Sequence, residues 1–201
     1  MIRISLQLEP SDFGARVRQP GQQFLKTNPN PTNKDFRNKC YWTRCLGQLR
    51  SAYNCICAYS ACWIPTQGSV DHFWPKSLRP DLAYEWSNFR LASEKLNNYK
   101  QESTSVVDPM TVQAGWFAID FHSFYIVPGA GLSNRLKHLI RTTINTLRLN
   151  SDDSFVNLRF EITKDFAKGD VSFEYLKRRY PFIAAELERQ SLSDAIKTTF
   201  R

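Results

Sequence analysis

Apolar residues recur at helical spacing through the C-terminal part of the chain. The clearest stripe consists of Leu132, Leu136, Leu139, Ile140, Ile144 and Leu147. This spacing predicts a helix with one buried face. Asp152-Asp153 and Pro181 suit the first positions of two further helices. A similar stripe over residues 34–53 predicts a helix near the N-terminus, with Thr32 or Asn33 as its cap.

Two short apolar runs predict β-strands in the middle of the chain. They cover residues 70–73 and 89–91, and a helix-favouring segment follows at residues 93–101, with Ser93 as its candidate cap. Residues 115–127 are rich in aromatic and β-branched side chains, which is also typical of strands. We therefore predict an α+β protein in which a small strand–strand–helix core is embedded in a mostly helical chain.

The segment between residues 14 and 33 lacks such periodicity. It contains two glycines and three prolines, which predicts a loop or arm with little regular structure. Its charges are basic, on Arg16, Arg18 and Lys26. Two interpretations remain open: the arm lies on the surface of its own domain, or it docks nucleic acid or a partner subunit.

We expect three regions along the chain. Residues 1–53 form an N-terminal arm and helix, residues 54–110 form the core, and residues 111–201 contain the strand-like segment and the C-terminal helices. The third region is expected to pack with the core as one compact unit.

The charge balance favours a polyanionic partner. Lys and Arg number 27 against 19 Asp and Glu, for a formal net charge of +8. Nucleic acid is the first candidate and an acidic membrane surface the second. Basic side chains line two predicted helices, at Arg135, Lys137, His138, Arg141 and Arg148 and at Lys177, Arg178 and Arg179. A solvated face is the default interpretation of such a run, and a binding face is the alternative.

Cysteine usage and hydropathy favour a reducing compartment. The five cysteines all lie between residues 40 and 62, which does not suggest a disulfide framework. Residues 1–10 lack the apolar core of a signal peptide. No run approaches the roughly eighteen apolar residues of a membrane span. We therefore expect a cytoplasmic protein that does not enter a membrane.

Polar residues suited to phosphodiester hydrolysis lie in and around the two central strands. Asp71 offers a hard oxygen ligand for Mg²⁺, and His72 can accept a proton from water near neutral pH. Adjacent residues on a regular strand point to opposite faces, so both reach one site only where the strand ends or bends. Asn88 lies at the second strand, and Asn97 and Lys100 lie on the helix that follows.

This constellation resembles the motif of HNH nucleases, whose catalytic core is the ββα-metal fold. The resemblance rests on Asp71-His72, Pro75-Lys76-Ser77, Asn88, Asn97 and Lys100. The HNH module of RNA-guided CRISPR nucleases has a similar start and spacing. Over residues 70–77, 83–93 and 107–109 the chain is most similar to the PtuB-like HNH subunit of Septu-type and retron-associated antiphage systems.

The resemblance implies roles for individual residues. His72 would be the general base, and Asp71 and Asn97 would hold Mg²⁺ or Mn²⁺. Asn88 would belong to the catalytic site by bracing the loop that positions His72, and Lys100 would lie near a phosphate. The basic side chains expected to contact nucleic acid are Lys76, Arg90, Lys95 and Lys100.

The chain departs from the resemblance in its cysteines. Many relatives carry two Cys-x-x-Cys pairs that bind a structural zinc, but no such spacing joins Cys55, Cys57 and Cys62, and no cysteine follows them. We therefore do not expect a structural zinc site. We expect packing to hold the core instead, with six candidates: Trp63, Phe73, Trp74, Trp86, Phe89 and Leu91.

The resemblance also implies a partner, an ABC-type ATPase of the PtuA-like kind that controls the nuclease in antiphage defence. The residues leave one alternative open, a non-catalytic module that binds nucleic acid or a partner. His122 is the second candidate for a catalytic or ligand histidine, although a partly buried strand histidine is the commoner case.

Overall fold

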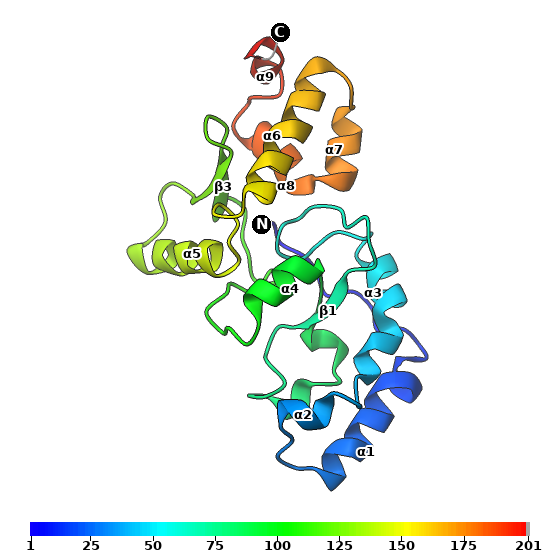
Figure 1. The fold of residues 1–201 in the computed structure, drawn as a ribbon. Coiled ribbons are helices and arrows are strands. Elements are labelled where there is room, and N and C mark those ends of the chain that lie inside the picture. The colour runs from blue at the N-terminus through cyan, green and yellow to red at the C-terminus, as the bar shows by residue number, and fades with distance from the viewer. Residues whose placement is uncertain (200–201) are drawn as a thin grey trace. The chain divides into compact units, whose positions relative to one another are not determined.

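The computed structural model describes residues 1–199 and shows an α+β protein with two small antiparallel sheets (Figure 1). Its helical elements are η1 (Gly14–Arg18, a π-helical segment), α1 (Gln19–Thr27), α2 (Asn33–Phe36), η2 (Tyr41–Cys45), α3 (Leu46–Ala52), η3 (Pro80–Leu82), η4 (Trp86–Asn88), α4 (Glu94–Lys100), α5 (Asn134–Thr146), α6 (Asp153–Lys168), α7 (Phe173–Arg179), α8 (Pro181–Arg189) and α9 (Ala195–Thr199). Its strands are β1 (Ser69–His72), β2 (Phe89–Ala92), β3 (Phe117–Asp120) and β4 (Tyr125–Pro128).

The chain divides into two compact units. The N-terminal unit contains residues 5–58 and 64–104, and the C-terminal unit contains residues 1–4, 59–63 and those from 105 onward. Of the three regions expected from the sequence, the first and the middle one each contribute to both units. Residues 200 and 201, at the end of the third region, lie outside the described residues.

The N-terminal unit is built around the β1–β2 pair and α4, which contacts β1 (Figure 1). The strands pair in antiparallel register, with Asp71 opposite Arg90. Helix α4 begins directly after β2, where the Ser93 hydroxyl accepts a hydrogen bond from the Leu96 amide at 3.3 Å. The two predicted strands and the Ser93 cap are therefore confirmed.

Aromatic side chains form the core of this unit. Phe13 packs edge-on against Trp86 and Phe89, with ring centroids 5.5 and 5.9 Å apart. Phe36 and Tyr84 continue the cluster, and both are almost fully buried. Edge-to-face packing of this kind adds specific geometry to the burial of large apolar surfaces. Among the aromatic residues we expected in the core, Trp86 and Phe89 are buried, whereas Trp74 is 43% exposed.

The prediction of a loop over residues 14–33 is wrong for most of its length. Residues 14–27 are helical, as η1 and α1. Pro20 is the second residue of α1, which continues directly from η1. Phe13, Val17 and Phe24 bury one face of this helical segment. The proline and glycine signals therefore mark the start of a helix rather than the absence of one.

Two of the three basic residues of this segment, Arg16 and Arg18, also have partners. Arg18 forms ion pairs with Glu9 and Glu85, and Arg16 pairs with Asp12. Arg16 additionally donates to the Arg44 carbonyl at 2.6 Å. These charges are therefore compensated within the N-terminal unit, which argues against a basic docking arm.

The helix predicted over residues 34–53 is interrupted. Thr32 caps α2 through a capping box with Asp35, as predicted, but α2 ends after one turn at Phe36. The chain becomes helical again at η2 and α3. The apolar stripe correctly predicts the buried face, with Phe36 and Leu49 in the core.

The C-terminal unit packs helices around the β3–β4 hairpin. Helix α5 contacts β4, and α7 contacts α8. Asp152 caps α6 and Pro181 begins α8, as predicted. The strand expected over residues 115–127 is a hairpin instead, because the Asp120 carboxylate accepts from Ser123 Oγ and from the His122 amide and so bends the chain. In the described part of the chain, no helix has the length and apolar character needed to cross a membrane.

Candidate active site

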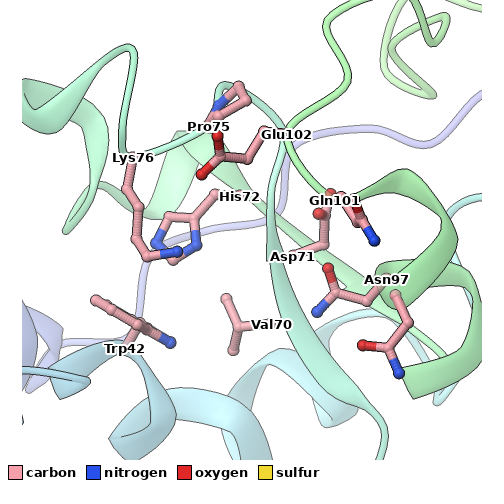
Figure 2. A pocket seen from close by; sticks show the side chains of 10 residues that line it. Trp42, Val70, Asp71, His72, Pro75, Lys76, Asn97, Gln101 and Glu102 are labelled. Carbon is pink, nitrogen blue, oxygen red and sulfur yellow. The ribbon is translucent and has the colours of Figure 1, made fainter. Parts of the chain in front are cut away.

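A polar pocket of about 420 Å³ opens in the N-terminal unit beside the end of β1 (Figure 2). Its walls come from η2, β1, the loop after β1, α4 and the turn after α4. The lining residues are Trp42, Val70, Asp71, His72, Pro75, Lys76, Asn97, Asn98, Gln101 and Glu102. Figure 2 shows Asp71 and His72 on the strand and Asn97 on the neighbouring helix.

Asp71 and His72 both reach this pocket because His72 is the last residue of β1. The side chains of a regular strand alternate between its two faces. After His72 the chain leaves the ladder, although the Phe73 amide still donates to the Asn88 carbonyl at 2.9 Å. The strand end thus provides the break in alternation that the sequence requires for one shared site.

The hydrogen bonding of His72 defines its tautomer. Its Nε2 lies 2.8 Å from the Ala83 carbonyl oxygen, which can only accept, so Nε2 carries the proton. Nδ1 is then the atom with the lone pair. Trp42 and Phe89 pack edge-on against the ring, with centroids 4.7 and 5.2 Å away. The ring is therefore held in one orientation with its basic nitrogen defined.

Burial also controls the charge of His72. The side chain is only 8% exposed, and desolvation lowers the pKa of its imidazole from 6.5 to about 3. The hydrogen bond to the Ala83 carbonyl opposes this shift, and the nearby ammonium groups of Lys76 and Lys100 reinforce it. His72 is consequently neutral at physiological pH, with Nδ1 unprotonated.

Asp71 pairs with a buried lysine. Lys100 Nζ lies 3.0 Å from Asp71 Oδ1 and 2.8 Å from the His72 carbonyl oxygen. Both side chains are almost completely removed from solvent, at 0% and 2% exposure. Lys100 thus fixes the Asp71 carboxylate and the end of β1 together. The resemblance implied a place near a phosphate for Lys100, and the structure places its ammonium group on Asp71.

Asn88 braces the loop after β1. Its Oδ1 accepts from the Trp74 amide at 2.8 Å, and its Nδ2 donates to the carbonyls of Trp74 and Leu82 at 3.0 and 3.1 Å. The side chain is 3% exposed and does not line the pocket. Since Leu82 precedes the carbonyl that holds His72, Asn88 acts on the site by positioning the loop.

Asn97 presents an amide oxygen to the pocket. Its Nδ2 donates to Ser69 Oγ at 3.0 Å, which orients the amide group. Among the described residues no donor occupies its Oδ1. Asp71 and Asn97 therefore contribute two hard oxygen donors to one cavity. That set fits Mg²⁺, which binds few protein ligands and completes its shell with water and substrate phosphate.

The other predicted nucleic-acid contacts lie in different environments. Lys76 lines the pocket, with its Nζ 5.9 Å from the Phe36 ring centroid and 5.8 Å from that of Trp42. Lys95 is exposed on α4 outside the pocket lining. Arg90 is 3% exposed and donates to the carbonyls of Ser87 and Phe89, so its guanidinium supports the chain where η4 leads into β2.

Four polar or aromatic residues of the pocket were not predicted as site residues from the sequence: Trp42, Asn98, Gln101 and Glu102. Trp42 lies on η2, far from the motif in the chain, and no local pattern connects it with His72. Glu102 follows α4 and accepts from Asn33 Nδ2 at 2.7 Å. That hydrogen bond, together with Ser77 and the charge of Lys76, lowers the pKa of the Glu102 carboxyl. His122, the second candidate histidine, is fully exposed in the β3–β4 turn and lies outside this pocket.

The chain matches no protein-family model and no curated protein sequence. The assignment of a function therefore rests on the geometry of the pocket. It combines a neutral, oriented imidazole, two oxygen donors for a hard cation and a lysine at the wall. Groups of this kind can activate water against a phosphodiester.

Proposed function

We propose that the protein is a metal-dependent endonuclease of the HNH type, with β1, β2 and α4 as its ββα-metal core. The observation that carries the proposal is the commitment of His72 Nε2 to the Ala83 carbonyl. It leaves Nδ1 as the proton acceptor of a residue that shares a pocket with Asp71 and Asn97. A buried histidine with a purely structural role would not need the oxygen donors of Asp71 and Asn97 in the same pocket.

In the proposed mechanism His72 Nδ1 takes a proton from the attacking water. Its lowered pKa keeps the imidazole unprotonated through the neutral range, and the carbonyl of Ala83 holds the ring while the proton is accepted. Asp71 and Asn97 would hold Mg²⁺ or Mn²⁺, which polarises the phosphate and stabilises the leaving oxygen when bound. Lys76 supplies a positive charge at the pocket wall.

Two residues position this machinery. Lys100 compensates the charge of Asp71 and holds the end of β1 through the His72 carbonyl. Asn88 holds the loop that leads to Ala83. Neither side chain needs to touch the substrate for its replacement to reduce cleavage.

The proposed substrate is DNA or RNA, and the proposed partner is a PtuA-like ABC-type ATPase in a cytoplasmic antiphage complex. The net charge of +8 supports a polyanionic substrate. The similarity of residues 70–77, 83–93 and 107–109 to PtuB-like proteins supports the partner.

Cleavage of plasmid DNA and of total tRNA in Mg²⁺ or Mn²⁺ tests the proposal, with the chain alone and with an ATPase encoded beside it. His72→Ala should reduce cleavage by about 10²–10⁴-fold, the usual contribution of a general base. His122→Ala is the matched control, because it removes a histidine that is fully exposed and outside the pocket. It should cut like the parent.

Two results would contradict these assignments. Undiminished cleavage by His72→Ala would remove the general base. Nucleic-acid binding without cleavage under every metal and partner condition would favour the non-catalytic binding module instead. Asp71→Asn and Asn97→Ala should each raise the metal concentration needed for half-maximal cleavage. An unchanged metal dependence in both variants would show that the cation lies elsewhere.

A further inference from the structure

The C-terminal unit contains a segment without any acidic residue. No Asp or Glu occurs between Asp120 and Asp152, although this segment includes the whole of α5. Its cations are Arg135, Lys137, Arg141 and Arg148, and it also carries His122 and His138. The packing of the β3–β4 hairpin and of α5 does not require that every charged side chain between Asp120 and Asp152 be positive.

Helix α5 carries three of these cations, Arg135, Lys137 and Arg141, and Arg148 follows its C-terminal end. Ile140 and Ile144 are buried, and the Thr143 hydroxyl ties the helix to the Val107 amide at 2.9 Å. With about 3.6 residues per turn, Arg135 and Arg141 project away from that buried face, and both are exposed. The exposed or half-exposed side chains around them are polar at Asn134, His138, Thr142 and Asn145, and apolar at Leu139, which is 38% exposed. We call Arg135, Lys137 and Arg141, together with the exposed side chains around them, the α5 face.

The cations of the α5 face differ in their pairing from three lysines of the same unit. Lys164, Lys177 and Lys197 each form an ion pair with a carboxylate. Across residues 1–199, no carboxylate lies within the 4.0 Å ion-pair distance of Arg135, Lys137 or Arg141. Their charge is therefore available to an external anion.

The chemistry of the α5 face selects among polyanions. A helix that lies in a membrane surface inserts an apolar face, but the apolar face of α5 is used inside the unit. Arg135 and Arg141 are six residues apart, about 9 Å along the helix. Duplex DNA carries about five phosphate charges over that length, at one per roughly 1.7 Å. Exposed cations and amides on one helix suit such a backbone, since both groups donate hydrogen bonds to phosphate oxygens.

We propose that the α5 face binds the phosphate backbone of nucleic acid, as a second contact surface in addition to the pocket that contains His72. This inference deepens the proposed nuclease function and rests on it for the choice of ligand. Phosphate contacts of this kind add affinity and orientation without sequence preference.

Binding of a fluorescein-labelled DNA duplex tests the inference in the absence of divalent metal, in a His72→Ala background so that no cleavage occurs. The test variant is Arg135→Gln/Lys137→Gln/Arg141→Gln. The matched control is Lys164→Gln/Lys177→Gln/Lys197→Gln, which makes the same change in net charge in the same unit. Fluorescence anisotropy is measured across a range of salt concentrations, and thermal melting checks that each variant is folded.

The loss of three phosphate contacts should make the negative slope of log K against log salt less steep by about 2.7. Between about 50 and about 200 mM salt, the parent should then lose about 40-fold more affinity than the test variant. The control should keep the parent's slope. Arg135→Lys/Arg141→Lys, which retains both charges, should also bind like the parent.

Several outcomes would overturn the inference. These are a parent that does not bind the duplex, a test variant with the parent's slope, and an equal loss in the control. Binding of the parent to phosphatidylserine vesicles but not to the duplex would assign the α5 face to a membrane instead. Because binding is measured without catalysis, an inactive protein that still binds through α5 would refute the nuclease proposal and leave this one standing.

Discussion

The buried imidazole of His72 should make the protein sensitive to mild acid. The pKa of His72 is lowered from 6.5 to about 3 in the folded protein, chiefly by burial. Between these values the unfolded chain binds a proton that the folded chain does not. The stabilising contribution is therefore fully present above pH 6.5 and is lost progressively as the pH falls towards 3.

The size of the effect follows from the width of that pH interval. Each unit of pKa difference corresponds to about 1.36 kcal/mol. At pH 5 the solution lies about one and a half units below the pKa of an unfolded histidine, so His72 alone should cost about 2 kcal/mol of unfolding free energy relative to neutral pH. That is a large share of the 5–15 kcal/mol typical of a folded domain, on the order of a fifth.

Urea unfolding at pH 7 and pH 5 measures this effect, with His72→Asn as the comparison. The asparagine amide can still donate a hydrogen bond towards the Ala83 carbonyl, but it cannot titrate. Carboxylates and the other histidines are shared, so their contributions cancel in the difference between the two proteins. The parent should lose about 2 kcal/mol more than the variant on acidification.

Imidazole NMR gives an independent reading of the same group. His72 should keep the neutral form with its proton on Nε2 at pH 5. Equal acid destabilisation of parent and variant, or an imidazole that titrates near pH 6.5, would refute the argument that burial controls its charge.

Two further predictions concern the packing around the pocket. Lys100→Met should destabilise the protein by about 3–5 kcal/mol, because Asp71 would be left buried and charged; the double variant with Asp71→Asn should recover most of this loss in urea unfolding, and a double variant no more stable than Lys100→Met would count against the pair. Gly21→Ala should cost about 1–3 kcal/mol, since its Cβ would lie 2.1 Å from Tyr84 Cγ. Gly14→Ala, whose added Cβ meets no atom within 4 Å, should be neutral or slightly stabilising. Thermal melts of both variants measure the difference, and equal effects of the two substitutions would show that the Tyr84 ring can move aside at little cost.

Local hydrogen bonding and periodicity were predictable from the sequence. The caps Ser93 and Asp152 and the start of α8 at Pro181 occur where expected. Each depends on residues within one turn of the helix they begin. The strands β1 and β2 were likewise predicted from short apolar runs. The order of Asp71 and the two asparagines also sufficed to suggest one site and the chemistry proposed for it.

Burial and charge pairing were decided only by the tertiary structure. The ammonium group of Lys100 lies on Asp71, and the guanidinium of Arg90 lies on backbone carbonyls, although both residues looked like phosphate contacts in the sequence. A charged side chain reveals its type in the sequence, but its partner is set by the segments that fold against it.

Tertiary packing also decided secondary structure where local signals conflicted. Residues 14–27 are helical because Phe13, Val17 and Phe24 pack into the aromatic core, which outweighs the proline and glycine signals around them. The same core supplies the Trp42 ring that orients His72 from a distant element. The sequence by itself determined which local elements and which chemical groups the protein has. Only long-range packing could decide which groups are buried, which are paired and which face the pocket, because desolvation and pairing depend on neighbours that are remote along the chain.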